Sequence, residues 1–228
     1  MPDNTEYFII PDMKKVIIIG AGGHGAEIDD YIATMNSLQK KNRIEIIGYI
    51  DDNPENYSSY QLSGPLLGDI RSHEIQKNCE YIIAIGKPDI RQQIVSSFVE
   101  KGAVFASLIH PTTMISASAV IGRGNVIAPM VNLGPNVKIG DFNLLNARLS
   151  IGHDSVLGNF NFVAPNVSLS GHTSVGNNNI FGINSATIPG ITIGSSNKIA
   201  AGMVLDKNVG DQSTVFYRFR EKVIAIPK

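Results

Sequence analysis

The dipeptide His153-Asp154 is the clearest candidate for acid–base chemistry in this 228-residue chain. It follows Ile151-Gly152, where the large residue predicts an inward-facing position and the glycine predicts a turn. The imidazole is therefore expected at or near an exposed corner. A neighbouring carboxylate fixes the tautomer of an imidazole and favours the imidazolium that forms when it takes up a proton. The pair predicts a general base, and a solvated surface histidine without function is the plain alternative.

A glycine-rich segment is the second candidate. Gly20-Ala21-Gly22-Gly23-His24-Gly25 matches G-x-G-x-x-G between an expected strand and an expected helix. Backbone N–H groups at a helix N-terminus bind phosphate, and His24 is a natural donor beside them. Asp51-Asp52 ends the next expected strand, where a contact with a ribose or a base is expected. We interpret the segment as a site for a nucleotide-linked substrate. An NAD site and a purely structural turn are the alternatives.

A repeat of six residues must position the histidine pair. From Ile115 to Leu205 every sixth residue is aliphatic or aromatic at fifteen of sixteen positions, and Thr187 is the exception. A period of six is neither helical nor a simple strand alternation. It is typical of the hexapeptide repeat of a parallel β-helix, in which three faces make one coil. This stretch predicts about five stacked coils of a solenoid.

The repeat also describes the surroundings of His153. One coil of 18 residues beyond it stands Gly171, which is expected to leave space for a ligand. His172, near the same corner, competes for the role of base. No catalytic metal is expected, because the repeat region holds only these two histidines and ligation by three histidines is unavailable.

Residues 14–110 follow a different pattern, in which short apolar runs alternate with helical segments. The expected strands are 16–19, 45–50, 81–85 and 104–108, and the expected helices are 26–35 and 89–100, with a loop over 56–65. This order predicts a small doubly wound α/β domain whose ligands lie at the carboxyl ends of the strands. The expected domains are a Rossmann-like domain over 1–110 and a β-helix domain with a C-terminal tail over 111–228.

Composition restricts the function classes. The net charge is −1, which does not indicate a nucleic-acid partner. The single cysteine, Cys79, allows no internal disulfide and fits a reducing compartment. No apolar run reaches the length of a membrane span, and Met1 to Asp12 lacks the basic start of a signal peptide. These features predict a cytoplasmic protein without membrane insertion.

Several motifs in a fixed order resemble those of a known family. They are Ile-Ile-Ile-Gly-Ala-Gly-Gly-His-Gly, Tyr-Ile-Asp-Asp, Ile-Ala-Ile-Gly, Leu-Ile-His-Pro, Gly-His-Asp and Gly-Ile-Asn-Ser-Ala-Thr-Ile-Pro-Gly-Ile-Thr-Ile-Gly. Over about residues 14–209 the chain resembles the bacterial sugar acyltransferases of the left-handed β-helix family. It is most similar to the PglD-like N-acetyltransferases of nucleotide-linked amino sugars, and NeuD-like sugar O-acetyltransferases share the layout.

This resemblance implies a homotrimer with acetyl-CoA in the groove between neighbouring left-handed β-helices. It implies that His153 is the base and that Asp154 raises its basicity. The positions implied to bind the nucleotide-sugar are Gly22, Gly23, His24, Asp51, Asp52 and Gly86, and those implied to contact acetyl-CoA are Phe162, Ile183 and Ala201. Two departures stand out. Phe162 replaces a histidine that is common in the family, and the segment 216–222 lacks the usual Gly-x-Pro-Ala-Lys.

The expected reaction is acetyl transfer from acetyl-CoA to the amino group of a nucleotide-linked amino-deoxy sugar, in the biosynthesis of a surface glycan or glycoprotein sugar. UDP is the expected nucleotide, with GDP and dTDP as alternatives. O-acetylation of a sugar hydroxyl by the same residues is the second hypothesis. A nucleotide-sugar-binding scaffold without catalysis is the third. An NAD-dependent enzyme would need a second nucleotide-binding half, which this chain lacks.

Overall fold

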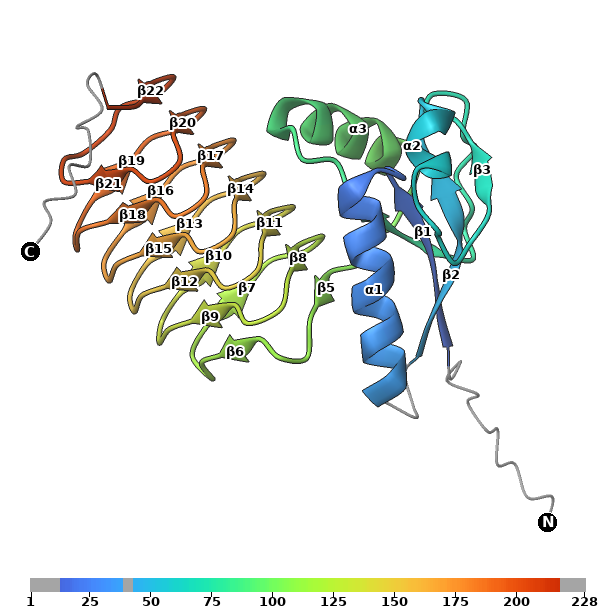
Figure 1. Cartoon of the computed structure of the whole chain (residues 1–228), viewed down its shortest axis with the longest axis horizontal. Coiled ribbons are helices and arrows are strands. Elements are labelled where there is room, and N and C mark those ends of the chain that lie inside the picture. Colours follow the sequence, from blue (N-terminus) through green and yellow to red (C-terminus); the bar gives the residue numbers. More distant parts are fainter. Residues whose placement is uncertain (1–12, 39–42, 218–228) are drawn as a thin grey trace, which may run out of the picture.

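The computed structural model describes residues 13–38 and 43–217, which form an α/β domain followed by a stack of coils (Figure 1). The elements of the first domain are β1 (Met13–Ile19), α1 (Gly23–Leu38), β2 (Arg43–Ile50), α2 (Pro54–Ser58), β3 (Leu66–Gly68), β4 (Glu80–Ile83) and α3 (Pro88–Glu100). Its strands form a four-stranded parallel sheet in the order β3-β2-β1-β4. The expected strands 16–19, 45–50 and 81–85 and both expected helices are present, with shifted ends.

The core of this domain explains why β1 ends in the continuous apolar run 16–19. Val16 and Ile18 pack in one buried cluster, whereas Ile17 and Ile19 pack in another. Successive side chains of a strand point to opposite faces of the sheet, so β1 is covered on both faces. Burial on both faces requires apolar residues at each of the four positions 16–19.

Two expectations for this domain were wrong in detail. No strand over 104–108 joins the α/β sheet, because Phe105 makes only an isolated parallel bridge with Tyr81. Leu108 instead begins β5, which pairs with the β-helix strand β8. The expected loop over 56–65 is partly helical, since α2 extends to Ser58. The side chain of Asn53 caps this helix by accepting a hydrogen bond from the Glu55 N–H.

The second region is a triangular prism with three parallel sheets as its faces. The seven-stranded sheet has the order β22-β20-β17-β14-β11-β8-β5. Its strands are β5 (Leu108–Ile109), β8 (Val126–Ile127), β11 (Leu144–Leu145), β14 (Phe162–Val163), β17 (Ile180–Phe181), β20 (Lys198–Ile199) and β22 (Thr214–Val215). The six-stranded sheet contains β6 (Met114–Ile115), β9 (Asn132–Leu133), β12 (Ser150–Ile151), β15 (Ser168–Leu169), β18 (Ala186–Thr187) and β21 (Val204–Leu205). The five-stranded sheet contains β7 (Val120–Ile121), β10 (Lys138–Ile139), β13 (Val156–Leu157), β16 (Ser174–Val175) and β19 (Thr192–Ile193).

The six-residue period places one large apolar side chain per strand inside the prism. Ile139 pairs with Leu157 and Leu157 with Val175 along one sheet, and all three are buried. Thr187, the exception in the repeat, also points inward and is buried. Its hydroxyl oxygen accepts a hydrogen bond from the Ser170 N–H at 2.9 Å. A polar side chain fits there because its hydroxyl has a partner.

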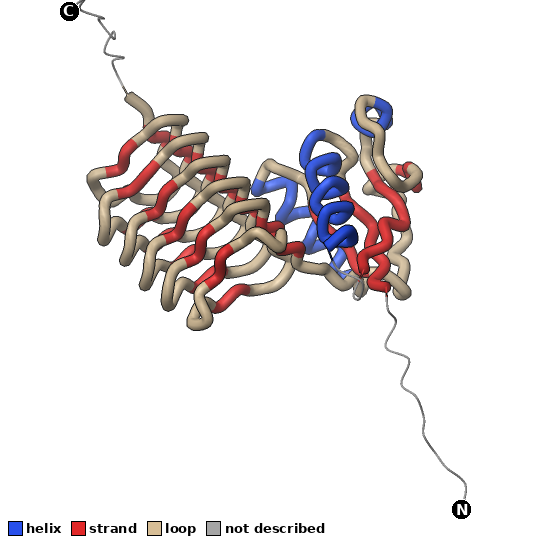
Figure 2. Tube along the Cα trace, turned by 60° about the horizontal axis from the view of Figure 1, so that its bottom comes forward, coloured by secondary structure: helices blue, strands red, loops and turns tan. Residues whose placement is uncertain are grey.

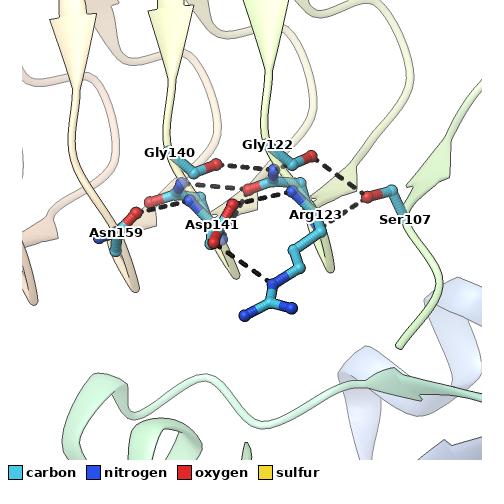
Figure 3. A network of polar contacts seen from close by, with 8 residues as sticks. Ser107, Gly122, Arg123, Gly140, Asp141 and Asn159 are labelled. Carbon is cyan, nitrogen blue, oxygen red and sulfur yellow. Dashed lines mark hydrogen bonds and ion pairs between the residues drawn. The ribbon is translucent and has the colours of Figure 1, made fainter. Parts of the chain in front are cut away.

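Two polar ladders hold successive coils together. Asparagines at 18-residue spacing form a buried one, in which each amide oxygen accepts hydrogen bonds from the next coil. Its members are Asn125, Asn143, Asn161, Asn179 and Asn197. A second ladder lies near the surface of the same corner (Figure 3), where Asp141 Oδ1 accepts from the Arg123 N–H at 2.9 Å and Asn159 Oδ1 accepts from the Asp141 N–H at 2.7 Å.

The α/β domain is docked against the first coils of the prism, as two views show (Figures 1 and 2). Val126 of β8 and Leu144 of β11 are buried in the same cluster as Ile28 and Ile32 of α1. The outer face of the seven-stranded sheet is therefore apolar where the domain covers it. Among the residues that the structure describes, no helix combines the length and the apolar character needed to cross a bilayer.

Candidate functional site

The exposed turn between β12 and β13 holds the predicted base. Nδ1 of His153 lies 2.8 Å from Oδ2 of Asp154, and the two side chains are 58% and 39% exposed. Asp154 has a φ of +57°, a left-handed conformation that aspartate tolerates better than most residues. The turn therefore presents an imidazole with a carboxylate at one nitrogen and leaves the other nitrogen for a substrate.

Asp154 stays ionised because its carboxylate accepts two hydrogen bonds. The amide of Asn136, one coil earlier, donates to Oδ1 at 2.9 Å, and His153 contacts Oδ2. These contacts, with that of Asn136 the larger, hold the pKa of the Asp154 carboxyl below its usual range. An ionised partner favours the tautomer of His153 with its proton on Nδ1, so Nε2 is the nitrogen that can accept a proton.

His172 lies on the next coil, at the position equivalent to Asp154. Its ring meets that of His153 edge to face, with 5.1 Å between the centroids, and its Nε2 is 3.9 Å from Oδ2 of Asp154. One ligand atom from each of these three exposed residues lies within 4.8 Å of the others. Two histidines and a carboxylate are a possible ligand set for zinc. The carboxylate of Asp154 thus adds a third candidate ligand to the two histidines that the repeat region holds.

Gly171 was expected to leave space for a ligand beside His153, and this expectation was wrong. A β-carbon on Gly171 would lie 2.8 Å from Nε2 of His153 and 2.9 Å from its Cε1. The imidazole itself therefore occupies the space above Gly171. The absence of a side chain at Gly171 makes room for the ring of His153 rather than for a substrate.

A pocket at the carboxyl ends of β1, β2 and β4 contains the other predicted group of residues. All six positions expected to bind the nucleotide-sugar line it, together with Phe162 and Ile180 from the β-helix. The full lining is Gly20, Gly22, Gly23, His24, Asp51, Asp52, Asn56, Ile70, Ala84, Ile85, Gly86, Lys87, Ile90, Ile94, Phe162 and Ile180. The pocket is thus bounded by the α/β domain on one side and by the seven-stranded sheet on the other.

The two aspartates of this pocket have different roles. Asp51 is buried, and its Oδ2 accepts a hydrogen bond from the Ala21 N–H at 2.7 Å, while its Oδ1 accepts from the Asn53 N–H at 2.8 Å. Its carboxylate therefore fixes the glycine-rich segment. Asp52 is more exposed, with Oδ1 accepting from the Ile70 N–H at 2.9 Å and Oδ2 lying 3.6 Å from Nε of Arg71. Asp52 is the aspartate better placed to meet a ligand.

His24, Gly86 and Phe162 converge at the junction of the two domains. Nδ1 of His24 lies 2.9 Å from a carboxylate oxygen of Glu27, and its ring meets that of Phe162 edge to face at 5.5 Å between centroids. A β-carbon on Gly86 would lie 3.5 Å from both of these rings. Such a distance is ordinary van der Waals contact, so the Gly86 turn lies beside both rings, and Phe162 forms the β-helix side of the pocket.

The three residues expected to contact acetyl-CoA lie at two places on the β-helix. Phe162 lies in the pocket with the glycine-rich segment. Ile183 and Ala201 follow β17 and β20, at equivalent positions of two successive coils, and both are exposed. They lie at the corner between the seven-stranded and six-stranded sheets.

His153 also lies apart from the pocket within one chain. Its turn joins the six-stranded sheet to the five-stranded sheet. In a triangular prism that corner is opposite the third face, which is the seven-stranded sheet that carries Phe162. A single copy of the chain therefore separates the predicted base from the predicted nucleotide-sugar site.

Sequence reasoning did not identify some residues of these sites. Asn136 and Ile180 were not singled out, although each stands 18 residues from a predicted site residue, Asp154 and Phe162 respectively. The coil length was a usable signal for both. Ile90 and Ile94 of the pocket come from one face of α3, and no sequence signal pointed to them as site residues.

Comparisons with known proteins agree with this architecture. Residues 15–98 match the PglD N-terminal domain. Over 117 residues the chain is 29% identical to the UDP-N-acetylbacillosamine N-acetyltransferase of Bacillus subtilis (strain 168). This alignment covers 50% of the chain and 51% of that protein, so it spans about half the length of the curated relative.

Two solved structures cover more of the chain. The acetyltransferase domain of PglB from Neisseria gonorrhoeae FA1090, in complex with acetyl coenzyme A, has a TM-score of 0.76 and 27% identity over 88% of this chain and 95% of that one. PerB from Caulobacter crescentus, in complex with CoA and GDP-perosamine, has a TM-score of 0.77 and 26% identity over 86% and 91%. The resemblance to the PglD-like sugar acetyltransferases is thereby confirmed, as is the fold class of a Rossmann-like α/β domain followed by a left-handed parallel β-helix.

Proposed function

We propose that this chain, whose residues 15–98 form a PglD N-terminal domain, transfers an acetyl group from acetyl-CoA to the amino group of a nucleotide-linked amino-deoxy sugar. The observation that carries the proposal is the exposed His153–Asp154 pair, with 2.8 Å between Nδ1 and Oδ2. UDP is the proposed nucleotide, and the product serves the biosynthesis of a surface glycan or glycoprotein sugar. The relatives' names point to the same class, since one is named for a UDP-linked sugar and another was solved with GDP-perosamine.

His153 acts as the general base in this proposal. The amine nitrogen of the sugar attacks the thioester carbonyl carbon of acetyl-CoA, and Nε2 of His153 takes the proton that the nitrogen loses. The carbon–sulfur bond then breaks, and the thiolate of CoA takes a proton from the imidazolium as it leaves. Asp154 holds the Nδ1 proton throughout. Backbone N–H groups would stabilise the negative charge on the carbonyl oxygen.

The pocket of the α/β domain holds the nucleotide-sugar. Gly23 and His24 begin α1 and Gly22 directly precedes it, at a helix N-terminus where free backbone N–H groups and the helix dipole favour phosphate. Asp52 is placed to meet the ribose or the base, and Asp51 acts mainly by holding the glycine-rich segment. Ile183 and Ala201 contact acetyl-CoA, whereas Phe162 and Gly86 lie where the sugar leaves the phosphates.

A neighbouring copy must complete the site. The base and the pocket lie on opposite sides of the prism, so a homotrimer in which the His153 corner of one copy faces the pocket of the next would unite them. Acetyl-CoA would occupy the groove between the two prisms. We further propose a division of the chain into domains 1–110 and 111–228, although β5 already pairs with the β-helix at Leu108–Ile109. The buried thiol of Cys79 fits a cytoplasmic reaction.

Release of CoA thiol tests the reaction. The protein should release thiol from acetyl-CoA in the presence of a UDP-linked amino sugar and much more slowly with the corresponding hydroxy sugar. GDP-linked and dTDP-linked amino sugars complete the panel. Preference for the hydroxy sugar would favour O-acetylation, and no release with any sugar would contradict catalysis.

Mixed assemblies test the shared site. His153→Ala destroys the base, and Gly23→Leu is expected to block the backbone approach of the phosphates, so each variant alone should be nearly inactive. The two variants are then unfolded and refolded together. A site in the mixed assembly is productive if it combines the intact pocket of a His153→Ala copy with the intact base of a Gly23→Leu copy. Random assembly gives about a quarter of wild-type activity if the two come from different copies. No recovery would mean that both residues act within one chain.

A further inference from the structure

Arg91 of α3 is a buried cation at the junction of the two domains. Its exposed fraction is 0%, and it is the largest of the fully buried side chains. Among the described residues no carboxylate forms an ion pair with it. Burial lowers the pKa of Arg91 to about 9, so the guanidinium stays protonated at neutral pH. A buried charge without a counter-ion requires other groups to compensate it.

Five backbone carbonyls compensate this charge. Nη1 donates to the carbonyl oxygens of Ile85 at 2.7 Å and Gly86 at 3.0 Å. Nε donates to Phe142 at 3.0 Å, and Nη2 donates to Phe160 at 2.6 Å and Asn161 at 3.1 Å. The first two carbonyls belong to the α/β domain and the other three to corners of two successive coils. One rigid guanidinium thus ties three segments together.

These three segments carry opposite sides of the pocket. Ile85 and Gly86 line it from the α/β domain, and Phe162 lines it from the β-helix. Phe160 and Asn161 are the residues that lead directly into Phe162. The guanidinium therefore sets the separation between the Gly86 turn and the phenyl ring of Phe162. The two are close, since a β-carbon on Gly86 would lie 3.5 Å from that ring.

Stability alone is a weak reason for such an arrangement. Replacement of a complete buried ion pair by well-packed apolar residues is often neutral or stabilising, so a buried charge is not in general required for stability. A planar group with five fixed donors differs from an apolar one in directionality, because it specifies one relative orientation of the segments that it joins. The arrangement is therefore suited to fixing geometry at the pocket.

We infer that Arg91 is a positioning residue for the sugar acceptor: it holds the Gly86 turn against the coil of Phe162 and so fixes the pocket in which the nucleotide-sugar lies. The inference rests on the proposed function for the identity of the ligand. Arg91 itself touches no substrate, because it is fully buried. Acetyl-CoA, which is proposed to lie in the groove between prisms, should not depend on it.

The test compares Arg91→Met, Arg91→Lys and the control Gln92→Ala. Gln92 also joins the domains, since its side-chain oxygen accepts a hydrogen bond from Asn178 at 3.1 Å, but this contact is exposed. Calorimetric titration with a UDP-linked amino sugar and with acetyl-CoA, together with steady-state kinetics and thermal unfolding, gives separate values for each ligand. Arg91→Met should weaken nucleotide-sugar binding by roughly 10- to 100-fold and raise its KM similarly, since small misplacements at a site have effects of this size. Acetyl-CoA binding should change by less than about threefold.

Arg91→Lys retains the charge but reaches fewer carbonyls, so it should show the same selective loss in smaller degree. Gln92→Ala should match the wild type. Equal binding of the nucleotide-sugar by all variants would overturn the inference. It would also be overturned if the affinities for the nucleotide-sugar and for acetyl-CoA fell together, in proportion to the loss of folded protein. If Arg91→Met does not fold, the lysine variant decides between the same outcomes. Failure of the proposed function would look different. The wild type itself would then neither bind the nucleotide-sugar nor release thiol, and this result would overturn both proposals.

Discussion

The imidazole of His153 lies directly over Gly171, so closely that a β-carbon on Gly171 would be 2.8 Å from Nε2. The same nitrogen is the one left free by the contact between Nδ1 and Asp154. The position of the proposed base therefore depends on a residue in the next coil that has no side chain.

Gly171→Ala should lower kcat by roughly 10- to 100-fold, because the methyl group displaces the imidazole and disturbs its contact with Asp154. Thermal stability should change little, since the exposed ring can move away. Steady-state thiol release measures the effect. Gly210→Ala is the matched control, because a β-carbon there has nothing within 4 Å. Unchanged kcat in Gly171→Ala would mean that the position of the ring is unimportant.

His153→Ala should lower kcat by roughly 10²–10⁴-fold, the usual contribution of a general base. The KM for acetyl-CoA should change little, because its proposed contacts are elsewhere. His172→Ala is the control and should remain active, although its ring is only 5.1 Å from that of His153. If the His172 variant lost activity and the His153 variant kept more than about a third of it, the base would be His172.

Removal of metal ions should leave activity unchanged. His153, Asp154 and His172 could together hold an ion, but the proposed reaction uses His153 as a free base. After dialysis against EDTA, the protein should release thiol at its original rate, whereas added Zn²⁺ should inhibit by occupying His153. Loss of activity on dialysis, with recovery on addition of Zn²⁺, would contradict the role of His153 as a base.

Asn161→Ala should destabilise the β-helix by about 2–4 kcal/mol, because buried polar groups lose their partners. Asn161 is fully buried, donates to the Gly176 carbonyl and accepts from the N–H of Asn179. Denaturant unfolding measures the change. Asn132→Ala, at an exposed position with only a 3.4 Å contact to Ser150, should cost little. Similar losses in the two variants would argue against the buried ladder as a source of stability.

The free energy of unfolding should fall as pH decreases below about 6.5, the ordinary pKa of histidine. Burial lowers the pKa of His110, and the Thr112 N–H donates to its Nδ1 at 3.2 Å. At pH values between the ordinary pKa and the lowered one, the unfolded chain binds a proton that the folded chain does not, so the free energy of unfolding falls as pH decreases. Below the lowered pKa both states are protonated, and the free energy of unfolding falls no further on account of His110. Chemical denaturation at pH 8 and pH 5 measures the slope. His110→Asn should reduce the slope and Asn132→Ala should not, while part of the slope remains because burial also lowers the pKa of His73. Equal slopes in all three proteins would contradict the assignment.

Much of the fold was predictable because local patterns determine it. The period of six from Ile115 to Leu205 requires one inward side chain per short strand, and the structure confirms those strands. The apolar run 16–19 predicted a strand covered on both faces, which it is. The His153–Asp154 contact was also predictable, since adjacent residues in a turn are close in any fold with that turn.

The arrangement between distant segments was decided only by tertiary structure. The segment 104–108 has the composition of a strand, yet Leu108 pairs with β8 of the prism, because backbone partners are chosen by the whole sheet and not by the segment. Phe162 shares a pocket with His24 only because the α/β domain docks on the seven-stranded sheet. Arg91 shows no signal in the sequence, since its five carbonyl partners lie up to 70 residues away and carbonyls are common to every residue. A sequence thus specifies periodic burial and local contacts, whereas the meeting of polar groups across a domain junction depends on how packed surfaces fit together.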